Sequence, residues 1–343
     1  MSADADRGLD LGSAAKRGAL FAVVAVVVSV AVSTLPGVDD VRDRLANADP
    51  VWIAGVVLLA IGSMLGYVRA LWAAFDRVVP WRRALVLGLA EQGANVLIPA
   101  GGAGGPALGA YVMQRIGVPG ELAAQRHAAL FLATSAVSFV AMALFGTLTS
   151  VGLLPSDASL PWRLIPAVGA SALIVLAIVY ARLPPPVERA HGRIGGSVFR
   201  VRRFVHNGVR TTYHLLRHGD RFLAVGAITY FACDVASLAC AFQAFGGGAP
   251  PLGDFVLAYT LGHAGAFLPT PGGIGGVEGG LIGMFAIYGA PLSVAAAAVL
   301  GYRVFQLGLP AIVGAVCLLR VRHVLAHPPP REEVEARFAA LER

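Results

Sequence analysis

Long apolar segments recur along the whole sequence and constrain its fold more than any other feature. A helix needs roughly 17–25 apolar residues to cross a bilayer core of about 30 Å, and segments of about this length follow one another here. They lie near 18–35, 51–75, 84–98, 125–153, 163–181, 222–245, 255–269, 275–288 and 292–319. Charged residues make up only 14% of the chain, against about a quarter in soluble domains. The sequence therefore predicts an all-α integral membrane protein, a polytopic helical bundle.

The basic residues indicate how these helices are oriented. The net charge is +7, and Lys16 is the only lysine, so arginine carries almost all of the positive charge. Basic residues gather before the first run and in the segments 77–83, 182–221 and 320–343, which the positive-inside rule places in the cytoplasm. We expect a multi-pass protein of the cell membrane with both termini in the cytoplasm, an uncleaved first helix at 18–35, and no nucleic-acid partner.

The other loops decide how often the chain crosses. Those of neutral or mildly acidic composition belong outside, namely 36–50, 154–162 and 246–254. Residues 84–124 must then enter from the cytoplasm and return to it, whereas residues 255–291 enter from outside and return there. A Gly/Pro cluster interrupts each of these pieces, at 98–111 in the first and at 267–281 in the second. Both two full spans and a re-entrant hairpin satisfy this count.

The two interrupted pieces belong to a repeat. GGAGG at 101–105 matches GGIGG at 272–276, and in each copy an X-Pro pair follows about a dozen residues later and opens a long helix. We predict two inverted helix–broken hairpin–helix repeats, repeat A at 51–151 and repeat B at 221–319. The chain then forms one membrane domain, 1–343, whose other parts are a first helix and external loop at 1–50, an additional helix and basic connector at 152–220, and a cytoplasmic tail at 320–343.

Interrupted segments at matching positions of two inverted halves indicate a transporter binding site near the bilayer midplane. Unpaired backbone at that depth survives only where it is buried in protein or lines a wet cavity, and half-helix N-termini there favour an anion. Gly275, Gly279 and Gly283 are predicted to form a stripe that lets another helix approach closely, and close helix packing alone is the alternative role of the two glycine-rich runs. The backbone candidates for the site are Pro99, Gly101, Gly102, Gly104, Gly105, Pro269, Pro271, Gly272, Gly273 and Gly275.

Charged and polar side chains within the apolar runs supply the other candidates, because such residues are costly in a bilayer. Glu91 and Asn95 lie one helical turn apart before the first break, and Glu278 follows the second. Arg303 can neutralise Glu278, either for function or as a purely structural pair. Asp234 has no local partner, so it must meet an arginine, a proton or a water-filled cavity. The side-chain candidates for substrate binding and translocation are Glu91, Asn95, Arg115, Arg126, Asp234, His263, Glu278 and Arg303.

Several of these residues carry a resemblance to a known family. PTPGGIGGVE at 269–278, followed by Gly289 and Tyr302-Arg303, resembles the transmembrane region of lysylphosphatidylglycerol synthases, also described as flippase-like uncharacterised membrane proteins. The first copy, PAGGAGGPAL at 99–108 with Tyr111, is similar to the weaker N-terminal motif of that family. The resemblance implies movement of a phospholipid or lipid-linked headgroup between leaflets, with Glu278 and Arg303 as site residues.

One position departs from the family pattern. Many members have an arginine just after the first glycine cluster, where this sequence has Gly109. Arg115 and Arg126 are the residues that could take the place of that arginine in headgroup recognition. The aminoacyl-transferase domain of some members is not expected here, because the segment after Leu319 is too short to fold as one.

The leading hypothesis is a lipid flippase-like transporter whose substrate bears a phosphate. The alternatives are a secondary carrier for a small anionic solute, an enzyme acting on a lipid-linked sugar or within the membrane, and a membrane partner of a cytosolic lipid- or glycan-modifying enzyme. No His-Glu-x-x-His, Gly-x-Ser-x-Gly or Gly-x-Gly-Asp motif occurs, so we expect neither an enzyme nor a cofactor or metal. The connector 182–221 is predicted to lie as an amphipathic helix on the anionic cytoplasmic leaflet, with a plain linker as the alternative.

Overall fold

Five long helices form the frame of the molecule in the computed structural model, which describes residues 39–77, 79–98, 104–184, 206, 208–213, 221–267 and 273–326. They are long and apolar enough to cross a membrane. They are α3 (Pro50–Ala74), α6 (Gly120–Ser150), α7 (Leu160–Arg182), α9 (Arg221–Ala244) and α12 (Leu292–Ala326). Within the described ranges all regular structure is helical. The prediction of an all-α polytopic membrane protein is confirmed.

Shorter helices form the two predicted hairpins. The first consists of α4 (Trp81–Leu97) and α5 (Gly104–Arg115), and the second of α10 (Leu252–Gly262), the 3₁₀ turn η1 (His263–Phe267) and α11 (Gly276–Ile287). At 1.5 Å per residue, α5, α10 and α11 are each about 17 Å long, well short of a bilayer core of about 30 Å. These lengths favour re-entrant hairpins over full spans.

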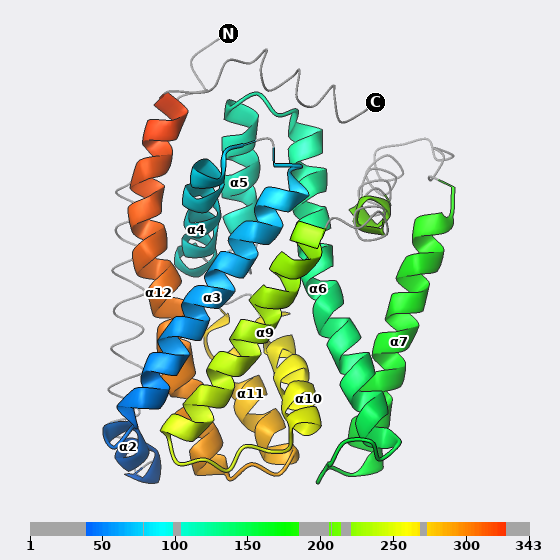
Figure 1. Ribbon diagram of the computed structural model, residues 1–343, viewed down its shortest axis with the longest axis vertical. Helices are drawn as coiled ribbons and strands as arrows, with labels where there is room; N and C mark the ends of the chain where they lie inside the picture. The colour runs from blue at the N-terminus through cyan, green and yellow to red at the C-terminus, as the bar shows by residue number, and fades with distance from the viewer. Residues whose placement is uncertain are drawn as a thin grey trace.

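The two hairpins lie at opposite ends of the molecule (Figure 1). The α4–α5 hairpin occupies the upper end in this view and the α10–α11 hairpin the lower end. The loops that follow α6 and α9 lie together at the lower end. Each half contains one long helix, two short ones and another long one, which is the order that the predicted repeat requires. The inverted relation between the halves, and the end that faces the cytoplasm, stay predictions.

Two boundaries differ from the sequence-based expectation. The predicted external loop 36–50 contains the helix α2 (Asp39–Ala46), and Nη1 of Arg44 donates a hydrogen bond to the carbonyl oxygen of Phe245 at 3.1 Å. The first break is shorter than 98–111, because α5 already begins at Gly104. The predicted first helix at 18–35 lies outside the described residues.

Backbone contacts between helices depend on glycine at a few crossings. α3 and α9 run side by side over much of their length (Figure 1). A Cβ atom on Gly66 would lie 2.4 Å from the backbone nitrogen of Tyr230, and one on Gly226 would lie 2.5 Å from that of Ala70. α4 and α12 cross similarly, since a Cβ on Gly93 would lie 2.6 Å from Cα of Gly314. Such close approach supports helix association in a membrane, where van der Waals packing replaces the hydrophobic effect.

The predicted packing stripe on α11 is wrong. Gly275, Gly279 and Gly283 are exposed, and a Cβ added to any of them would meet nothing within 4 Å. The close approach in this hairpin uses the other face of the helix. A Cβ on Gly280 would lie 2.3 Å from the carbonyl oxygen of Gly262. Periodic spacing identified a glycine-rich helix, but the fold decides which of its faces meets a neighbour.

Candidate functional site

A cavity of about 380 Å³ lies between the two broken hairpins. The C-terminal end of α4 lines it from the first hairpin, and η1 and the start of α11 line it from the second. Residues near the middle of α3, α6, α9 and α12 supply the other walls. Polar and charged side chains in the lining include Gln92, Asn95, Asp234, His263, Arg303 and Gln306. Described residues of both hairpins therefore line the same cavity, at the level of mid-helix residues of the long helices.

Glu278 and Arg303 form an ion pair at this cavity. Oε1 of Glu278 accepts a hydrogen bond from Nε of Arg303 at 2.7 Å, and the two side chains are 15% and 6% exposed. Oε2 accepts a hydrogen bond from the backbone N–H of Gly275 at 2.7 Å. Gly275 is the N-cap of α11 and has φ +86°, which only glycine adopts readily. The carboxylate thus satisfies an orphan amide and complements the positive end of the helix while it neutralises Arg303.

Asp234 also lines the cavity, and it is held by two tyrosines. Its Oδ2 accepts hydrogen bonds from the hydroxyl of Tyr259 at 2.5 Å and from that of Tyr302 at 2.8 Å. Of the environments predicted for this residue, the structure supplies a cavity and hydroxyl donors rather than an arginine. Sequence reasoning missed Tyr259 because nothing in its spacing marks it, whereas α9, α10 and α12 converge only in three dimensions.

His263 presents a hydrogen-bond acceptor at this site. Its Nδ1 lies 2.9 Å from the carbonyl oxygen of Tyr259, which can only accept, so Nδ1 carries a proton. In the neutral ring Nε2 is then an acceptor, and this buried atom has no partner among the described residues. The cavity consequently offers an anionic group at Asp234, a cationic group at Arg303 and an open acceptor at His263.

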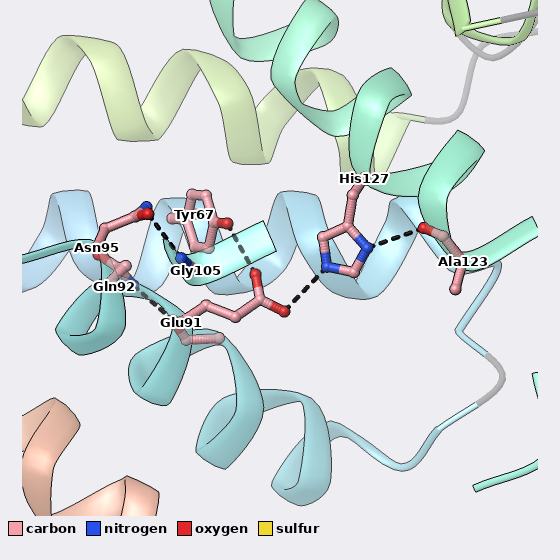
Figure 2. Close-up of polar contacts among 8 residues, drawn as sticks. Tyr67, Glu91, Gln92, Asn95, Gly105, Ala123 and His127 are labelled. Carbon is pink, nitrogen blue, oxygen red and sulfur yellow. Dashed lines mark hydrogen bonds and ion pairs between the residues drawn. The ribbon is translucent and has the colours of Figure 1, made fainter. Parts of the chain in front are cut away.

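Two candidates of the first hairpin have different roles (Figure 2). Asn95 lines the cavity, and its Oδ1 accepts a hydrogen bond from the N–H of Gly105 at 2.7 Å, which ties α4 to the first turn of α5. A Cβ on Gly105 would lie 2.5 Å from the carbonyl oxygen of Glu91, so glycine is needed for this contact. Glu91 itself is fully buried beside Tyr67 and His127 and is not part of the cavity lining.

The two other arginine candidates lie away from the cavity lining. Nη2 of Arg126 pairs with Oδ2 of Asp76 at 2.5 Å, and Nη1 donates to the carbonyl oxygen of Ala74 at 3.2 Å. This arginine therefore closes the C-terminal end of α3. Arg115 is exposed in the last turn of α5, with its guanidinium 5.3 Å from the ring centre of Tyr111.

The remaining candidates are backbone positions. Gly273 lines the cavity, Gly275 caps α11, and Gly104 lies at the start of α5. A Cβ on Gly104 would lie 2.8 Å from the carbonyl oxygen of Ala94. The candidates that lie outside the described residues are Pro99, Gly101, Gly102, Pro269, Pro271 and Gly272.

Asp254, in the first turn of α10, has a structural environment. It is fully buried, and its carboxylate accepts hydrogen bonds from the hydroxyl of Ser156 at 2.6 Å and from the N–H groups of Asp157 at 2.8 Å and Ala158 at 3.2 Å. These contacts fasten the loop between α6 and α7 to the start of α10. No group of three or more His, Cys, Asp or Glu side chains that could hold a metal occurs in the described part of the chain.

The spans, the two hairpins and the central cavity define a multi-pass helical membrane protein with a charged pair near the level where its hairpins break. Comparison with known proteins gives its family. The sequence matches the family described as lysylphosphatidylglycerol synthase TM region over residues 20–314, and the chain belongs to that family. The resemblance inferred from the PTPGGIGGVE motif is thereby confirmed, and membership connects the chain to a lipid-related membrane function.

Two relatives from Methanothermobacter thermautotrophicus are both named UPF0104 membrane protein. One is 27% identical over an alignment of 336 residues, gaps included, and the matched region covers 87% of this chain and 91% of the relative. The other is 24% identical over an alignment of 329 residues, gaps included, and the matched region covers 88% of this chain and 95% of the relative. The similarity therefore extends over nearly the whole length of each protein.

Proposed function

We propose that this protein moves a phospholipid or a lipid-linked headgroup between the leaflets of the cell membrane. The observation that carries the proposal is the cavity between the two hairpins, which combines Asp234 and Arg303 with an apolar edge. Charged side chains at membrane depth generally mark a substrate or ion path. The family to which the chain belongs adds support, because its name refers to a lipid synthase.

The edge of the cavity at α6 favours a lipid over a solute in water. Phe131 lines the cavity, yet 64% of its surface is exposed. It lies about 16 Å along α6 from Gly120, which is within the hydrocarbon core if the helix begins near the interface. A ring exposed at that depth faces acyl chains. The cavity then opens sideways into the bilayer, so that a headgroup can enter while its acyl chains stay in lipid.

The charges of the cavity support a phosphate-bearing headgroup through one arginine. Arg303 lines the cavity, whereas Arg69, Arg115 and Arg126 do not. A phosphate that reaches Arg303 must compete with Glu278 for the guanidinium, and an arginine fork can hold a phosphate through two parallel hydrogen bonds. Asp234 is placed to meet a cationic or hydroxyl part of the same headgroup.

Transport of fluorescent phospholipids in proteoliposomes tests the proposal, combined with leaflet-resolved lipid analysis of cells with and without the protein. We expect the reconstituted protein to increase the rate at which labelled lipid reaches the opposite leaflet, and native mass spectrometry to detect co-purified phospholipid. Glu121→Gln, which alters an exposed carboxylate at the start of α6, should behave as wild type. If only neutral glycolipids co-purify and move, the phosphate assignment is wrong. If a soluble anion accumulates and lipids stay in place, the protein is a solute carrier.

We also propose that both termini and the connector 182–221 are cytoplasmic, and that the connector contacts anionic lipid or a cytosolic enzyme. Most of this segment lies outside the described residues. Among its described residues, 208–213 are helical and contact α6, where the hydroxyl of Thr212 donates to the carbonyl oxygen of Ala129 at 3.3 Å. The arginine-rich composition is the support for a membrane-surface role.

A further inference from the structure

Glu91 and His127 make a buried contact outside the cavity (Figure 2). Oε1 of Glu91 lies 3.1 Å from Nε2 of His127, and Oε2 accepts a hydrogen bond from the hydroxyl of Tyr67 at 2.9 Å. The side chains of His127 and Glu91 are 4% and 0% exposed. Gln92 and Asn95, on the same helix as Glu91, line the cavity. Glu91 is therefore out of reach of a substrate but lies on the helix that a substrate would touch.

The geometry of this contact requires a bound proton. Nδ1 of His127 lies 2.9 Å from the carbonyl oxygen of Ala123, which can only accept, so Nδ1 carries a proton. The contact between Nε2 and Oε1 then needs a second proton, because a lone pair on nitrogen would otherwise face a carboxylate oxygen. That proton is on Nε2 in an imidazolium–carboxylate pair, or on Oε1 in a neutral imidazole–carboxylic acid pair. Both arrangements are electrically neutral, as a buried site requires.

We propose that Glu91 and His127 form a proton-binding site, and that binding and release of this proton are coupled to movement of the α4–α5 hairpin. Glu91 belongs to the hairpin, whereas Tyr67 belongs to α3 and His127 to α6. Transfer of the proton from Nε2 to Oε1 breaks an N–H bond, forms an O–H bond and replaces an ion pair by two neutral groups, which separate more easily. Loss of the proton leaves a buried carboxylate beside a neutral ring, which favours separation of α4 from α6.

The surroundings leave few other groups to hold this charge. Tyr230 of α9 contacts the ring of Tyr67, with 5.8 Å between the centroids, and Tyr230 lines the cavity. One aromatic residue thus separates the proton site from the cavity wall. The other titratable and charged groups on the packed elements have contacts of their own or face outward. Arg69 lies over Phe222, Arg126 pairs with Asp76, Tyr302 contacts Asp234, and Arg303 contacts Glu278. Cys317 is buried on α12, whereas Tyr111, Arg115 and Glu121 are exposed.

Gly109 on α5 leaves room for the proton-binding contact. A Cβ at this position would lie 1.9 Å from Oε1 of Glu91 and 2.3 Å from Nε2 of His127. The substitution Gly109→Ala must therefore push the two groups apart. Gly169→Ala is a matched control, because a Cβ at that helical position of α7 would meet nothing within 4 Å. The position at which the sequence departs from the family pattern is thus the one that faces this site.

A spectroscopic experiment tests the site without any substrate. Infrared difference spectra and ¹⁵N-histidine NMR of the purified full-length protein are recorded as a function of pH, with His127→Gln used to assign the ring signals. In wild type we expect a protonated Nδ1 and one further proton shared with Glu91. Glu91→Gln should lose the signal of this shared proton and its pH dependence. It should keep the fold, because its amide can donate to neutral His127 and accept from Tyr67. Gly109→Ala should lose it too, whereas Glu121→Gln and Gly169→Ala should retain it.

A transport experiment tests the coupling and rests on the proposed function. In proteoliposomes a pH gradient should change the rate of lipid movement by wild type and by Glu121→Gln, and this dependence should be lost in Glu91→Gln. An unchanged response to the gradient in Glu91→Gln would overturn the coupling. Wild-type spectra without the additional proton would overturn the site. If wild type moves no lipid, the proposed function fails, while the spectra still decide whether the proton site exists.

Discussion

The substitution Glu278→Gln tests what Glu278 contributes to the stability of the second hairpin and, in a separate measurement, what it contributes to transport. Removing one partner of a buried ion pair costs about 3–5 kcal/mol. Because Glu278 keeps 15% of its side-chain surface exposed beside a cavity, the lower end of that range applies. Glutamine can still accept the hydrogen bond from Gly275, so the cap remains, and the lost helix-dipole interaction adds only about 0.3–1 kcal/mol. We expect Glu278→Gln to lower the free energy of unfolding by about 3–4 kcal/mol.

That loss changes the ratio of folded to unfolded protein by roughly two to three orders of magnitude, and a domain stable by about 5–15 kcal/mol survives it. Unfolding in mixed micelles, followed by circular dichroism, measures the loss, and hydrogen exchange of the α11 amides localises it. Transport by the folded variant should be abolished. Arg303→Lys is the matched variant, because lysine keeps the charge but cannot contact Glu278 and Gln306 with a planar fork.

Exchanging the charges of Glu278 and Arg303 provides a second test of the ion pair. Glu278→Arg combined with Arg303→Glu restores opposite charges, but an arginine cannot accept the hydrogen bond from Gly275 and places a cation at a helix N-terminus. The double variant should therefore recover only part of the stability and of the transport. Complete recovery, or a loss of less than about 1 kcal/mol in Glu278→Gln, would refute the assignment of Glu278 as both cap and ion-pair partner. Wild-type transport by Glu278→Gln would reduce the residue to a packing role.

Three further outcomes are expected. Cysteines introduced at the exposed positions Arg82 and Glu121 should react with an impermeant reagent from one side of the membrane, and cysteines at Leu252 and Leu292 from the other side. Labelling of positions 82 and 121 from opposite sides would contradict the re-entrant hairpin. Gly93→Ala should lower the free energy of unfolding by about 1–3 kcal/mol because its Cβ meets Gly314, whereas Gly308→Ala should not, and equal thermal stabilities would contradict the crossing. Asp254→Asn should destabilise the protein by about 1–3 kcal/mol in micelle unfolding, since an amide NH2 replaces one of the two accepting oxygens and the remaining hydrogen bonds lose the charge of the carboxylate. Transport per folded molecule should stay at the wild-type level in that variant, and its loss would assign Asp254 a direct role.

Several features of this protein follow from its sequence alone. Backbone groups in lipid must find hydrogen bonds within their own helix, so hydropathy and length are sufficient to predict α3, α6, α7, α9 and α12. The Gly/Pro clusters predicted where the chain interrupts its helices, because few other residues permit such breaks. The pairing of Glu278 with Arg303 was also predictable, since two buried opposite charges need each other.

Only the tertiary structure decided which side chains meet around these breaks. It placed Asp234 between the hydroxyls of Tyr259 and Tyr302, and it removed Glu91 from the cavity to join His127. It also turned the glycine stripe of α11 outward. These arrangements depend on how closely whole helices approach one another. That distance is set by many packed side chains from distant parts of the chain, and no local pattern of residues encodes it.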